Sequence, residues 1–320
     1  MTVVGVSLLA LVLTVGLPIW VPLLGFVDLV RGQTRLPLVR LVAFALAWAW
    51  LEVVAVSAAV WLWVTGRARQ WDPHYALQKW WTARILGALR YTIGLQVAVE
   101  VPDDWGDGPY VALCRHASLG DAVMSCWVLS STGSLKPRYV LKKELKSMPS
   151  IDIFGHRLPN YFVDRSSSNM SAELVGIEQM AYGLDGQQVA VIFPEGTRAS
   201  DAKRRRELER LAVRNPPRAE RLAGLKHLLP PKSAGASSLL ASVPGADVLL
   251  MRHSGFDGLD TFKGILARLR QGPPRARVVV ERFVREEIDR AGAFAEWLDD
   301  KWLQMDDLVA RAIEGRTQHG

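Results

Sequence analysis

The sequence predicts an α/β fold, with a mixed, largely parallel sheet flanked by helices and an N-terminal hydrophobic pair of membrane helices. The first observation is the crowding of apolar residues into positions 3–64. The second is a series of short apolar runs without polar alternation, typical of strands covered on both faces. These strand candidates are residues 110–114, 138–141, 161–163, 188–193, 247–251 and 277–283. The third is that stretches of helical periodicity separate the runs, as in a sheet whose strands are joined by helices.

The composition is that of a folded protein, with 320 residues of which 49% are hydrophobic and 22% charged. A formal net charge of +7 indicates an anionic membrane surface or a phosphorylated substrate as partner. Nucleic acid is disfavoured, because no helix-turn-helix, zinc-ligand or RNA-binding signature accompanies the charge. Cys114 and Cys126 are the only cysteines, which excludes a disulfide framework and a Cys-rich metal site.

The N-terminal region contains two apolar stretches. Residues 3–27 carry no charge, and this run is long enough to cross a bilayer, for which about 20 apolar residues are needed. We expect Pro18 and Pro22 to kink its second half. A second stretch, residues 41–64, is interrupted only by Glu52. A cleaved signal peptide fits poorly, because no basic segment precedes the first run and a second run follows it.

We therefore divide the chain into a membrane-anchoring helical pair, residues 1–66, and an α/β catalytic domain, residues 67–320. Arginines flank the second stretch on both sides, so the positive-inside rule leaves open whether the pair spans the bilayer or enters it as a hairpin. Either arrangement places the catalytic domain on the side of the N-terminus, which we expect to be cytoplasmic. Glu52 is an intramembrane carboxylate, and an interfacial or protonated group is favoured over a functional one.

Helical periodicity marks four further segments, residues 70–90, 120–130, 171–183 and 293–314. The first is either an amphipathic helix at the membrane surface or an ordinary core-facing helix. Residues 202–221 are rich in arginine and glutamate and indicate a solvated helix or excursion. The basic run 203–206 leaves contact with anionic lipid head groups as an alternative.

The first motif that suggests chemistry is His116-Ala-Ser-Leu-Gly-Asp121, which directly follows the predicted strand 110–114. An aspartate at this spacing is able to hold one ring nitrogen while the other abstracts a proton. No G-x-S-x-G turn is present, and neither cysteine lies in a nucleophile signature. A base without an enzyme nucleophile indicates that the substrate supplies its own, such as a hydroxyl. Taken alone, the spacing is equally typical of a helix cap or a core histidine.

The second motif is Phe193-Pro-Glu-Gly-Thr-Arg198, at the carboxyl end of another predicted strand, where α/β sheets place their ligands. Pro194 and Gly196 favour a tight turn close to a ligand. Glu195 is suited to accept hydrogen bonds from a polyol, and the guanidinium of Arg198 is suited to phosphate. The plain alternative is a turn with a surface Glu–Arg pair.

Together, the two motifs resemble the hallmark motifs of the glycerolipid (lysophospholipid) acyltransferase family, which includes 1-acylglycerol-3-phosphate acyltransferases. An intermediate family block is also similar, on the residues Lys142-Lys-Glu-Leu145, Pro149, Gly155 and Phe162-Val-Asp-Arg165. The resemblance is firm over residues 112–198. Arg115 departs from it, because asparagine is common before the histidine.

This resemblance implies that His116 is the general base, that Asp121 orients it, and that no acyl-enzyme forms. It implies a substrate-binding role for Lys143, Arg165, Glu195, Gly196, Thr197 and Arg198. The expected donor is acyl-CoA or acyl carrier protein, used as a co-substrate, with no metal and no bound cofactor. The expected partners are membrane lipids and a lysophospholipid acceptor.

The sequence therefore predicts a membrane O-acyltransferase of phospholipid biosynthesis, with 1-acylglycerol-3-phosphate as the default acceptor. Residues 226–232 resemble a family subgroup that includes lysocardiolipin acyltransferases, so another lysolipid acceptor stays open. A membrane lipid hydrolase that uses His116 and Asp121 on water, and a non-enzymatic membrane scaffold, are the alternatives from other classes. His227 and His253 have no metal-ligand partner at useful spacing and are interpreted as structural or surface residues.

Overall fold

The computed structural model describes residues 2–118, 120–164, 169–256 and 261–317. At its centre is a seven-stranded sheet with the strand order β1-β7-β6-β2-β5-β3-β4. The strands are β1 (Gln96–Glu100), β2 (Tyr110–Cys114), β3 (Lys136–Lys142), β4 (Tyr161–Val163), β5 (Gln188–Ile192), β6 (Asp247–Ser254) and β7 (Arg275–Phe283). All neighbouring strands are parallel except β6 and β7. The prediction of a mixed, largely parallel sheet is confirmed.

Five parallel strands place their carboxyl ends at one edge of the sheet. In the order β6-β2-β5-β3-β4, each of these strands is followed by a loop that starts at this edge. The first motif follows β2 and the second follows β5, and these two strands are hydrogen-bonded neighbours. The topology thus brings together two motifs that are about 80 residues apart in the sequence.

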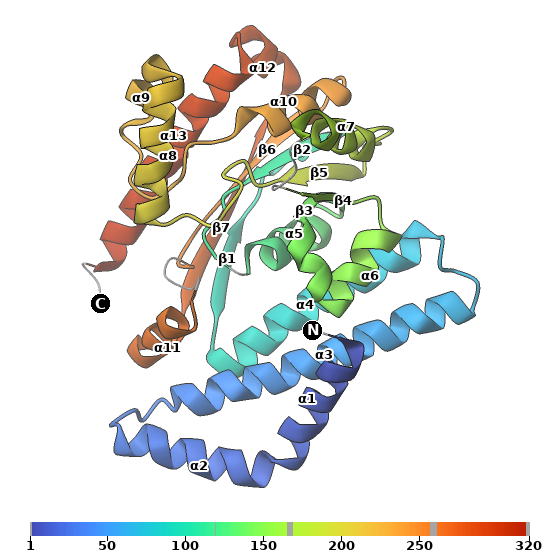
Figure 1. Cartoon of the computed structure of the whole chain (residues 1–320), viewed down its shortest axis with the longest axis vertical. Helices are drawn as coiled ribbons and strands as arrows, with labels where there is room; N and C mark the ends of the chain where they lie inside the picture. Colours follow the sequence, from blue (N-terminus) through green and yellow to red (C-terminus); the bar gives the residue numbers. More distant parts are fainter. Residues whose placement is uncertain (1, 119, 165–168, 257–260, 318–320) are drawn as a thin grey trace.

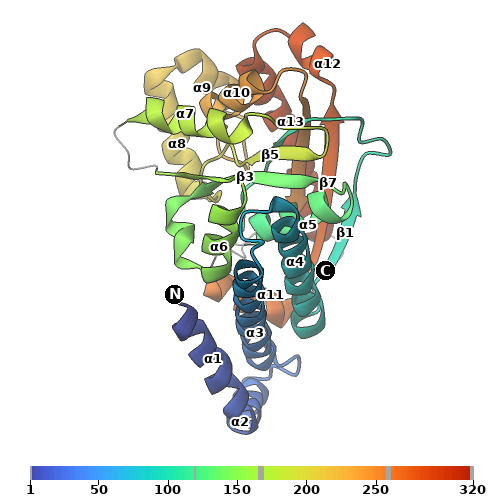
Figure 2. The same cartoon turned by 90° about the vertical axis from the view of Figure 1, so that its right-hand side faces the viewer.

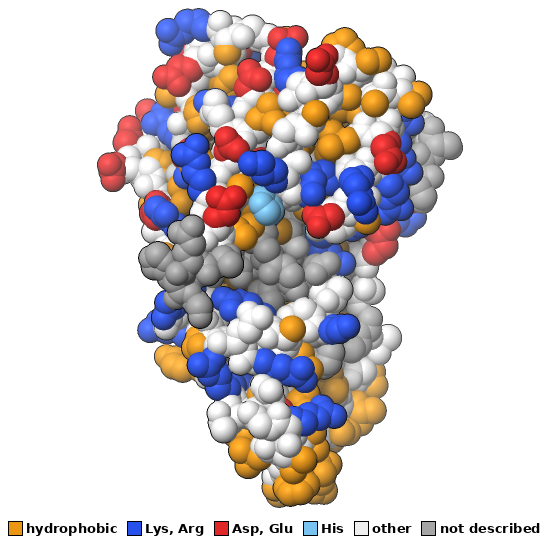
Figure 3. Space-filling view, turned by 90° about the vertical axis from the view of Figure 1, so that its left-hand side faces the viewer, with side chains coloured by type: hydrophobic (Ala, Val, Ile, Leu, Met, Phe, Trp, Pro, Cys, Tyr) orange, Lys and Arg blue, Asp and Glu red, His pale blue; other side chains and the backbone are white. Residues whose placement is uncertain are grey.

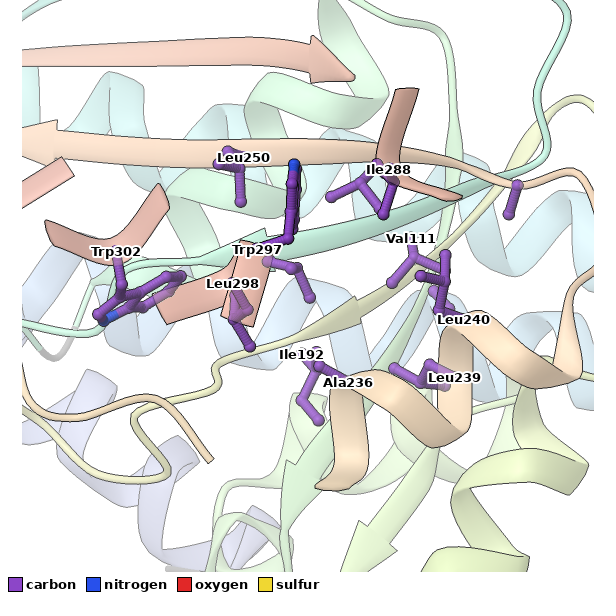
Figure 4. Close-up of a cluster of buried hydrophobic side chains, with 14 of the residues drawn as sticks. Val111, Ile192, Ala236, Leu239, Leu240, Leu250, Ile288, Trp297, Leu298 and Trp302 are labelled. Atoms are coloured by element: carbon purple, nitrogen blue, oxygen red, sulfur yellow. The ribbon is translucent and has the colours of Figure 1, made fainter. Parts of the chain in front are cut away.

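Helices cover both faces of this sheet (Figure 1). One face carries α7 (Met170–Ala181), α10 (Ser233–Ser242) and α13 (Phe294–Thr317). Figure 4 shows this core, where Ile192 of β5 and Leu250 of β6 meet Leu239 of α10 and Trp302 of α13. The other face carries α4 (Trp71–Ile93), α5 (Asp121–Ser131) and α11 (Phe262–Gln271), which pack on the alternate residues of the same strands. Both faces being apolar explains why these strands lack polar alternation.

The N-terminal region forms α1 (Val3–Val15), α2 (Leu17–Val30) and α3 (Pro37–Val64), which project from the sheet domain (Figure 2). The first apolar run is broken at Gly16, where α1 and α2 meet at 73°. This break lies earlier than the kink expected from the prolines. Pro18 stands in the first turn of α2, where proline is tolerated. By length and composition, α3 is able to cross a membrane, and the bent pair adds a second crossing only if both halves form one span.

Helix α3 contacts the sheet domain along its length. Before its first turn, an Nη1 hydrogen of Arg35 is donated to the carbonyl of Gln271. Within it, Arg40 Nε donates to the carbonyl of Thr92 over 2.8 Å. At its middle, the fully buried Glu52 accepts hydrogen bonds from Ser150, over 2.7 Å from the hydroxyl and 3.2 Å from the backbone N–H. Glu52 therefore joins α3 to the first turn of α6 (Pro149–Arg157) and does not face lipid.

Several elements were not expected from the sequence: β1, α6, α10, α11, and α12 (Arg285–Arg290). Strand β1 is an edge strand whose residues are alternately exposed and half-buried, so it lacks the apolar run of its neighbours. Strand β6 extends three residues beyond the expected 247–251. Residues 202–221 form the charged helices α8 (Asp201–Arg214) and α9 (Pro216–Leu222), as the solvated-helix interpretation expects.

Candidate active site

The first motif is organised around the carboxylate of Asp121, at the start of α5. Its Oδ2 lies 2.9 Å from Nδ1 of His116 and accepts the backbone N–H groups of Ala117 and Ser118 over 2.6 and 2.8 Å. A carboxylate only accepts, so Nδ1 of His116 carries a proton, and in the neutral imidazole the lone pair is then on Nε2. The loop thus presents a histidine in the tautomer that a general base requires.

Asp121 is ionised in this setting. Burial disfavours its charged form, but the nearby ring of His253 and hydrogen bonds from His116 and Ser118 together hold the pKa of Asp121 well below its usual range. The side chain of Asp121 is 1% exposed, whereas that of His116 is 16% exposed. The carboxylate of Asp121 is therefore shielded from solvent, whereas the imidazole of His116 is accessible to solvent.

The second motif surrounds the same histidine. The ring of Phe193 lies 4.9 Å from that of His116, measured between centroids. Glu195 Oε1 accepts the backbone N–H of His116 over 2.7 Å, and the N–H of Ala199 donates to the carbonyl of His116 over 2.9 Å. The segment after β5 thus hydrogen-bonds to both the backbone N–H and the carbonyl of His116.

Glu195 differs from what its sequence context suggested. We expected its carboxylate to face a polyol, but the side chain is 1% exposed and its Oε2 accepts the N–H of Leu229 over 3.0 Å. Desolvation raises the pKa of Glu195 to about 8, although the backbone donors of His116 and Leu229 act in the opposite direction. Glu195 thus hydrogen-bonds to two other segments of the site, at His116 and at Leu229.

The remaining residues of the turn differ in exposure, since Gly196 is buried and the two residues after it are not. Gly196 has a φ of +72°, a conformation that a residue with a side chain rarely adopts. Thr197 and Arg198 are partly exposed. Two lysines that were not predicted as site residues also lie here. Lys203 Nζ is 3.3 Å from Thr197 Oγ1 and 3.0 Å from the carbonyl of Arg198. The side chain of Lys232 lies against Gly196.

The intermediate block lies further along the same sheet edge. Lys143, directly after β3, is exposed, and its Nζ is 2.9 Å from Oδ2 of Asp164, directly after β4. These strands continue the sheet beyond β5. Arg165 lies outside the described residues. The structure therefore places Lys143 on the correct edge, two strands from His116, and pairs it with an acid rather than with the two motifs.

His253 is the site residue that the sequence interpretation missed. It was interpreted as structural or surface; it is 4% exposed, which excludes the surface alternative, and its Nε2 lies 3.2 Å from Oδ1 of Asp121. It stands near the end of β6, which neighbours β2. The signal was its position at the carboxyl end of a predicted strand, but that strand was expected to end at Met251.

The described residues supply no evident enzyme nucleophile beside His116. Cys114 and Cys126 are buried, and desolvation raises the pKa of both thiols, that of Cys126 to about 12. Ser118 is buried, and its hydroxyl contacts Oδ1 of Asp121. Thiolate chemistry requires an accessible group of lowered pKa, which is the opposite of what is found. The arrangement suits a reaction in which the substrate supplies the nucleophile.

The His–Asp pair and the turn 193–198 lie together at the carboxyl edge of an α/β sheet, and no nucleophile is evident beside them among the described residues. A sequence model of the acyltransferase family matches residues 96–242, which contain both motifs. This part of the chain, somewhat less than half of it, is therefore similar to the acyltransferase family.

No curated protein matches the chain. Among solved structures, the chain is similar to the crystal structure of the 1-acyl-sn-glycerophosphate (LPA) acyltransferase, PlsC, from Thermotoga maritima. The TM-score is 0.43 and the identity 14%, with 82% of this chain and 96% of that chain covered.

Proposed function

We propose that the protein transfers a fatty acyl group from acyl-CoA or acyl carrier protein to the free hydroxyl of a lysophospholipid, with 1-acylglycerol-3-phosphate as the default acceptor. The observation that carries this proposal is the 2.9 Å contact between His116 Nδ1 and Asp121 Oδ2 beside the turn 193–198. A base of this tautomer, with no enzyme nucleophile at hand, supports direct attack by a substrate alcohol.

In the proposed reaction, the acceptor hydroxyl gives its proton to Nε2 of His116 while its oxygen attacks the thioester carbonyl. The tetrahedral intermediate then collapses, the carbon–sulfur bond breaks, and the proton passes to the departing thiolate. Asp121 stabilises the transient imidazolium through Nδ1. No covalent acyl-enzyme is formed. General-base assistance of this kind contributes typically about 10²–10⁴-fold to the rate.

Basic side chains beside the turn support an anionic acceptor. Arg198, Lys203 and Lys232 lie around the 193–198 turn, and a guanidinium is suited to bind phosphate through two parallel hydrogen bonds. Figure 3 shows basic side chains gathered across the middle of one face of the molecule. We infer that the acceptor phosphate binds beside Arg198, with its free hydroxyl towards His116.

Membrane attachment is part of this proposal, because both substrates carry long acyl chains. Large apolar side chains are exposed on α1 and α2, among them Val4, Leu8, Leu11, Ile19, Leu23 and Phe26. Figure 3 shows hydrophobic side chains exposed at the lower end of the molecule, where α1 and α2 lie in Figure 1. Trp61 and Trp63, at the end of α3, are also exposed, as expected of an interfacial belt.

We further propose that α3 lies in one leaflet and does not cross the bilayer. Arg35 and Arg40 bond the start of α3 to the sheet domain, and Arg157 Nη1 donates to the carbonyl of Ala68, just beyond its end, over 3.4 Å. A helix with both ends on one domain cannot have them on opposite sides of a membrane. We place the sheet domain on the cytoplasmic side, where acyl thioesters are formed.

The test of this function is a substrate panel. Membranes that contain the full chain are incubated with labelled acyl-CoA, or with labelled acyl carrier protein, and one lysolipid at a time, including lysophosphatidate and lysocardiolipin. Membranes of the same host without the protein are the control. We expect label to enter the diacyl product of at least one phosphate-bearing acceptor. Release of free fatty acid without any acceptor dependence would instead support the hydrolase alternative.

A further inference from the structure

Asp121 contacts two histidines and not one. His116 occupies Oδ2, and Nε2 of His253 lies 3.2 Å from Oδ1. His253 lies on β6, which neighbours β2 on one side. The turn 193–198 follows β5, which neighbours β2 on the other side. It is 4% exposed, so it reaches the site from inside the protein, beneath the carboxylate.

The two oxygens of Asp121 are held in different ways. Oδ2 accepts backbone N–H groups from Ala117 and Ser118 in addition to His116. Oδ1 contacts the hydroxyl of Ser118 and the ring of His253. Every one of these partners except His253 belongs to the same short segment as Asp121, residues 116–121. His253 therefore gives the carboxylate its side-chain contact with the sheet.

His253 is itself firmly placed. The backbone of His253 pairs with that of Val278 in the antiparallel ladder of β6 and β7. Its carbonyl accepts a hydrogen bond from Nη1 of Arg115 over 2.5 Å, and its ring packs edge-to-face on Phe256 at 5.4 Å between centroids. Arg115 is 1% exposed and directly precedes His116 in the chain. Two contacts, one through Asp121 and one through Arg115, thus link β6 to the catalytic loop.

We propose that His253 is a positioning residue for acyl transfer, which donates its Nε2–H to Oδ1 of Asp121 and so holds the carboxylate against Nδ1 of His116. This inference rests on the proposed function of His116 and Asp121. His253 touches neither acyl donor nor acceptor in this arrangement. Its effect falls on the turnover rate and not on substrate affinity, because it fixes the orientation of the base.

The inference is tested with two substitutions in the full chain, purified in detergent. His253→Leu removes the donor but keeps an apolar side chain against Phe256. His253→Gln keeps a nitrogen donor at a similar reach from the backbone. His74→Leu is the matched control, since His74 is 2% exposed and lies on α4, outside the two motifs.

We expect His253→Leu to lower kcat by roughly 10–100-fold, the usual effect of losing a group that orients a site residue, with KM changed less than threefold. His253→Gln should recover most of this loss, and His74→Leu should leave kcat unchanged. The inference is overturned if His253→Leu keeps wild-type kcat, if the change falls on KM, or if the folded Gln variant is as slow as the Leu variant.

A second measurement does not depend on turnover. With ¹⁵N-labelled histidine, long-range ¹H–¹⁵N spectra report which ring nitrogen of His116 is protonated. We expect the Nδ1–H tautomer in the wild type and in His253→Gln, and a tautomer mixture in His253→Leu. An unchanged spectrum in the Leu variant would overturn the inference. If the wild-type protein shows no transferase activity, the proposed function alone is contradicted. The spectrum would still decide whether His253 orients His116 through Asp121.

Discussion

At the scale of single residues, the site depends on which side chains face the ligand and which face the protein. Arg198 is partly exposed, and we propose that it faces the ligand, whereas Glu195 is buried in the protein. The family resemblance assigned both to the substrate. The six-residue motif therefore contains an exposed residue proposed to bind substrate and a buried residue that supports the site. We expect substitution of the first to change acceptor KM and substitution of the second to change the pH dependence of stability.

Arg198→Lys tests the residue proposed to bind substrate. Lysine keeps the charge but loses the planar pair of donors, so a phosphate-bearing acceptor loses one charge-assisted hydrogen bond. We expect KM for lysophosphatidate to rise by roughly 10–150-fold, since such a bond contributes about 1.5–3 kcal/mol. The KM of the acyl donor should stay the same. Arg206→Lys, on the exposed part of α8, is the control, and equal acceptor KM values in both variants would remove Arg198 from the phosphate site.

Glu195→Gln tests the buried residue. The pKa of Glu195 is about 8 in the folded protein, against an ordinary value of 4.5, because the side chain is desolvated. The folded state therefore holds a proton that the unfolded state releases, and this contribution to stability is full below pH 4.5 and is lost as the pH rises through about 8.

We expect the unfolding midpoint of the wild type to fall between pH 5.5 and 8.5 more steeply than that of Glu195→Gln, which does not titrate. Midpoints measured by thermal unfolding in the same detergent at each pH check this. Parallel curves for the two proteins would contradict the buried, desolvated placement of Glu195.

At the scale of elements, the apolar strands were predictable because burial on both faces leaves a plain signal in the sequence. The two motifs directly follow β2 and β5. The predicted bounds of these two strands agree with the observed bounds to within one residue. Edge strand β1 and helix α10 were missed, since β1 is half-exposed and the short, serine-rich α10 lacks a clear helical period.

Part of the site was beyond sequence reasoning for a physical reason. His116 and Asp121 lie in one loop, so their contact follows from local spacing. Contacts made by Lys203, Lys232 and His253 depend on strand order and on where a helix begins, which local patterns do not encode. The motif located Glu195 in the site but did not predict the direction of its side chain. That direction depends on a contact with Leu229, from a segment 34 residues later.

The junction between α3 and α6 gives the prediction at this scale. Ser150→Ala removes the hydroxyl that donates to the buried Glu52 over 2.7 Å and leaves part of that carboxylate without a partner. We expect a loss of about 1–3 kcal/mol in the free energy of unfolding. Ser242→Ala is the control, because the Ser242 hydroxyl only donates to a carbonyl one turn earlier. Equal stability of the two variants, measured by denaturant unfolding, would show that the α3–α6 contact is weak.

At the scale of the whole molecule, the question is how the domain meets the membrane. The division into an anchor (1–66) and a catalytic domain (67–320) remains a proposal, and α3 blurs it by packing on α4 and α6. An amphipathic role at the membrane surface had been one alternative for α4. One face of α4 packs on α5 and the sheet, and Trp81 and Ile85 pack against α3, which favours the core-facing alternative.

Single-cysteine labelling tests the leaflet arrangement. Gln33→Cys lies between α2 and α3, and Thr65→Cys lies directly after α3. We expect a membrane-impermeant maleimide to label both positions from the side that carries the catalytic domain. Cys114 and Cys126 are buried and should react slowly. Labelling of Gln33→Cys from the opposite side alone would show that α3 crosses the bilayer.

The central claim is that His116 takes the proton from the acceptor hydroxyl. Its most direct test is the kcat of purified His116→Ala in acyl transfer from labelled acyl-CoA to lysophosphatidate, with His227→Ala as the matched control. The account predicts a loss of at least ~10²-fold for His116→Ala, the lower range for a missing general base, and an unchanged rate for His227→Ala. A folded His116→Ala protein that turns over at the wild-type rate would contradict it.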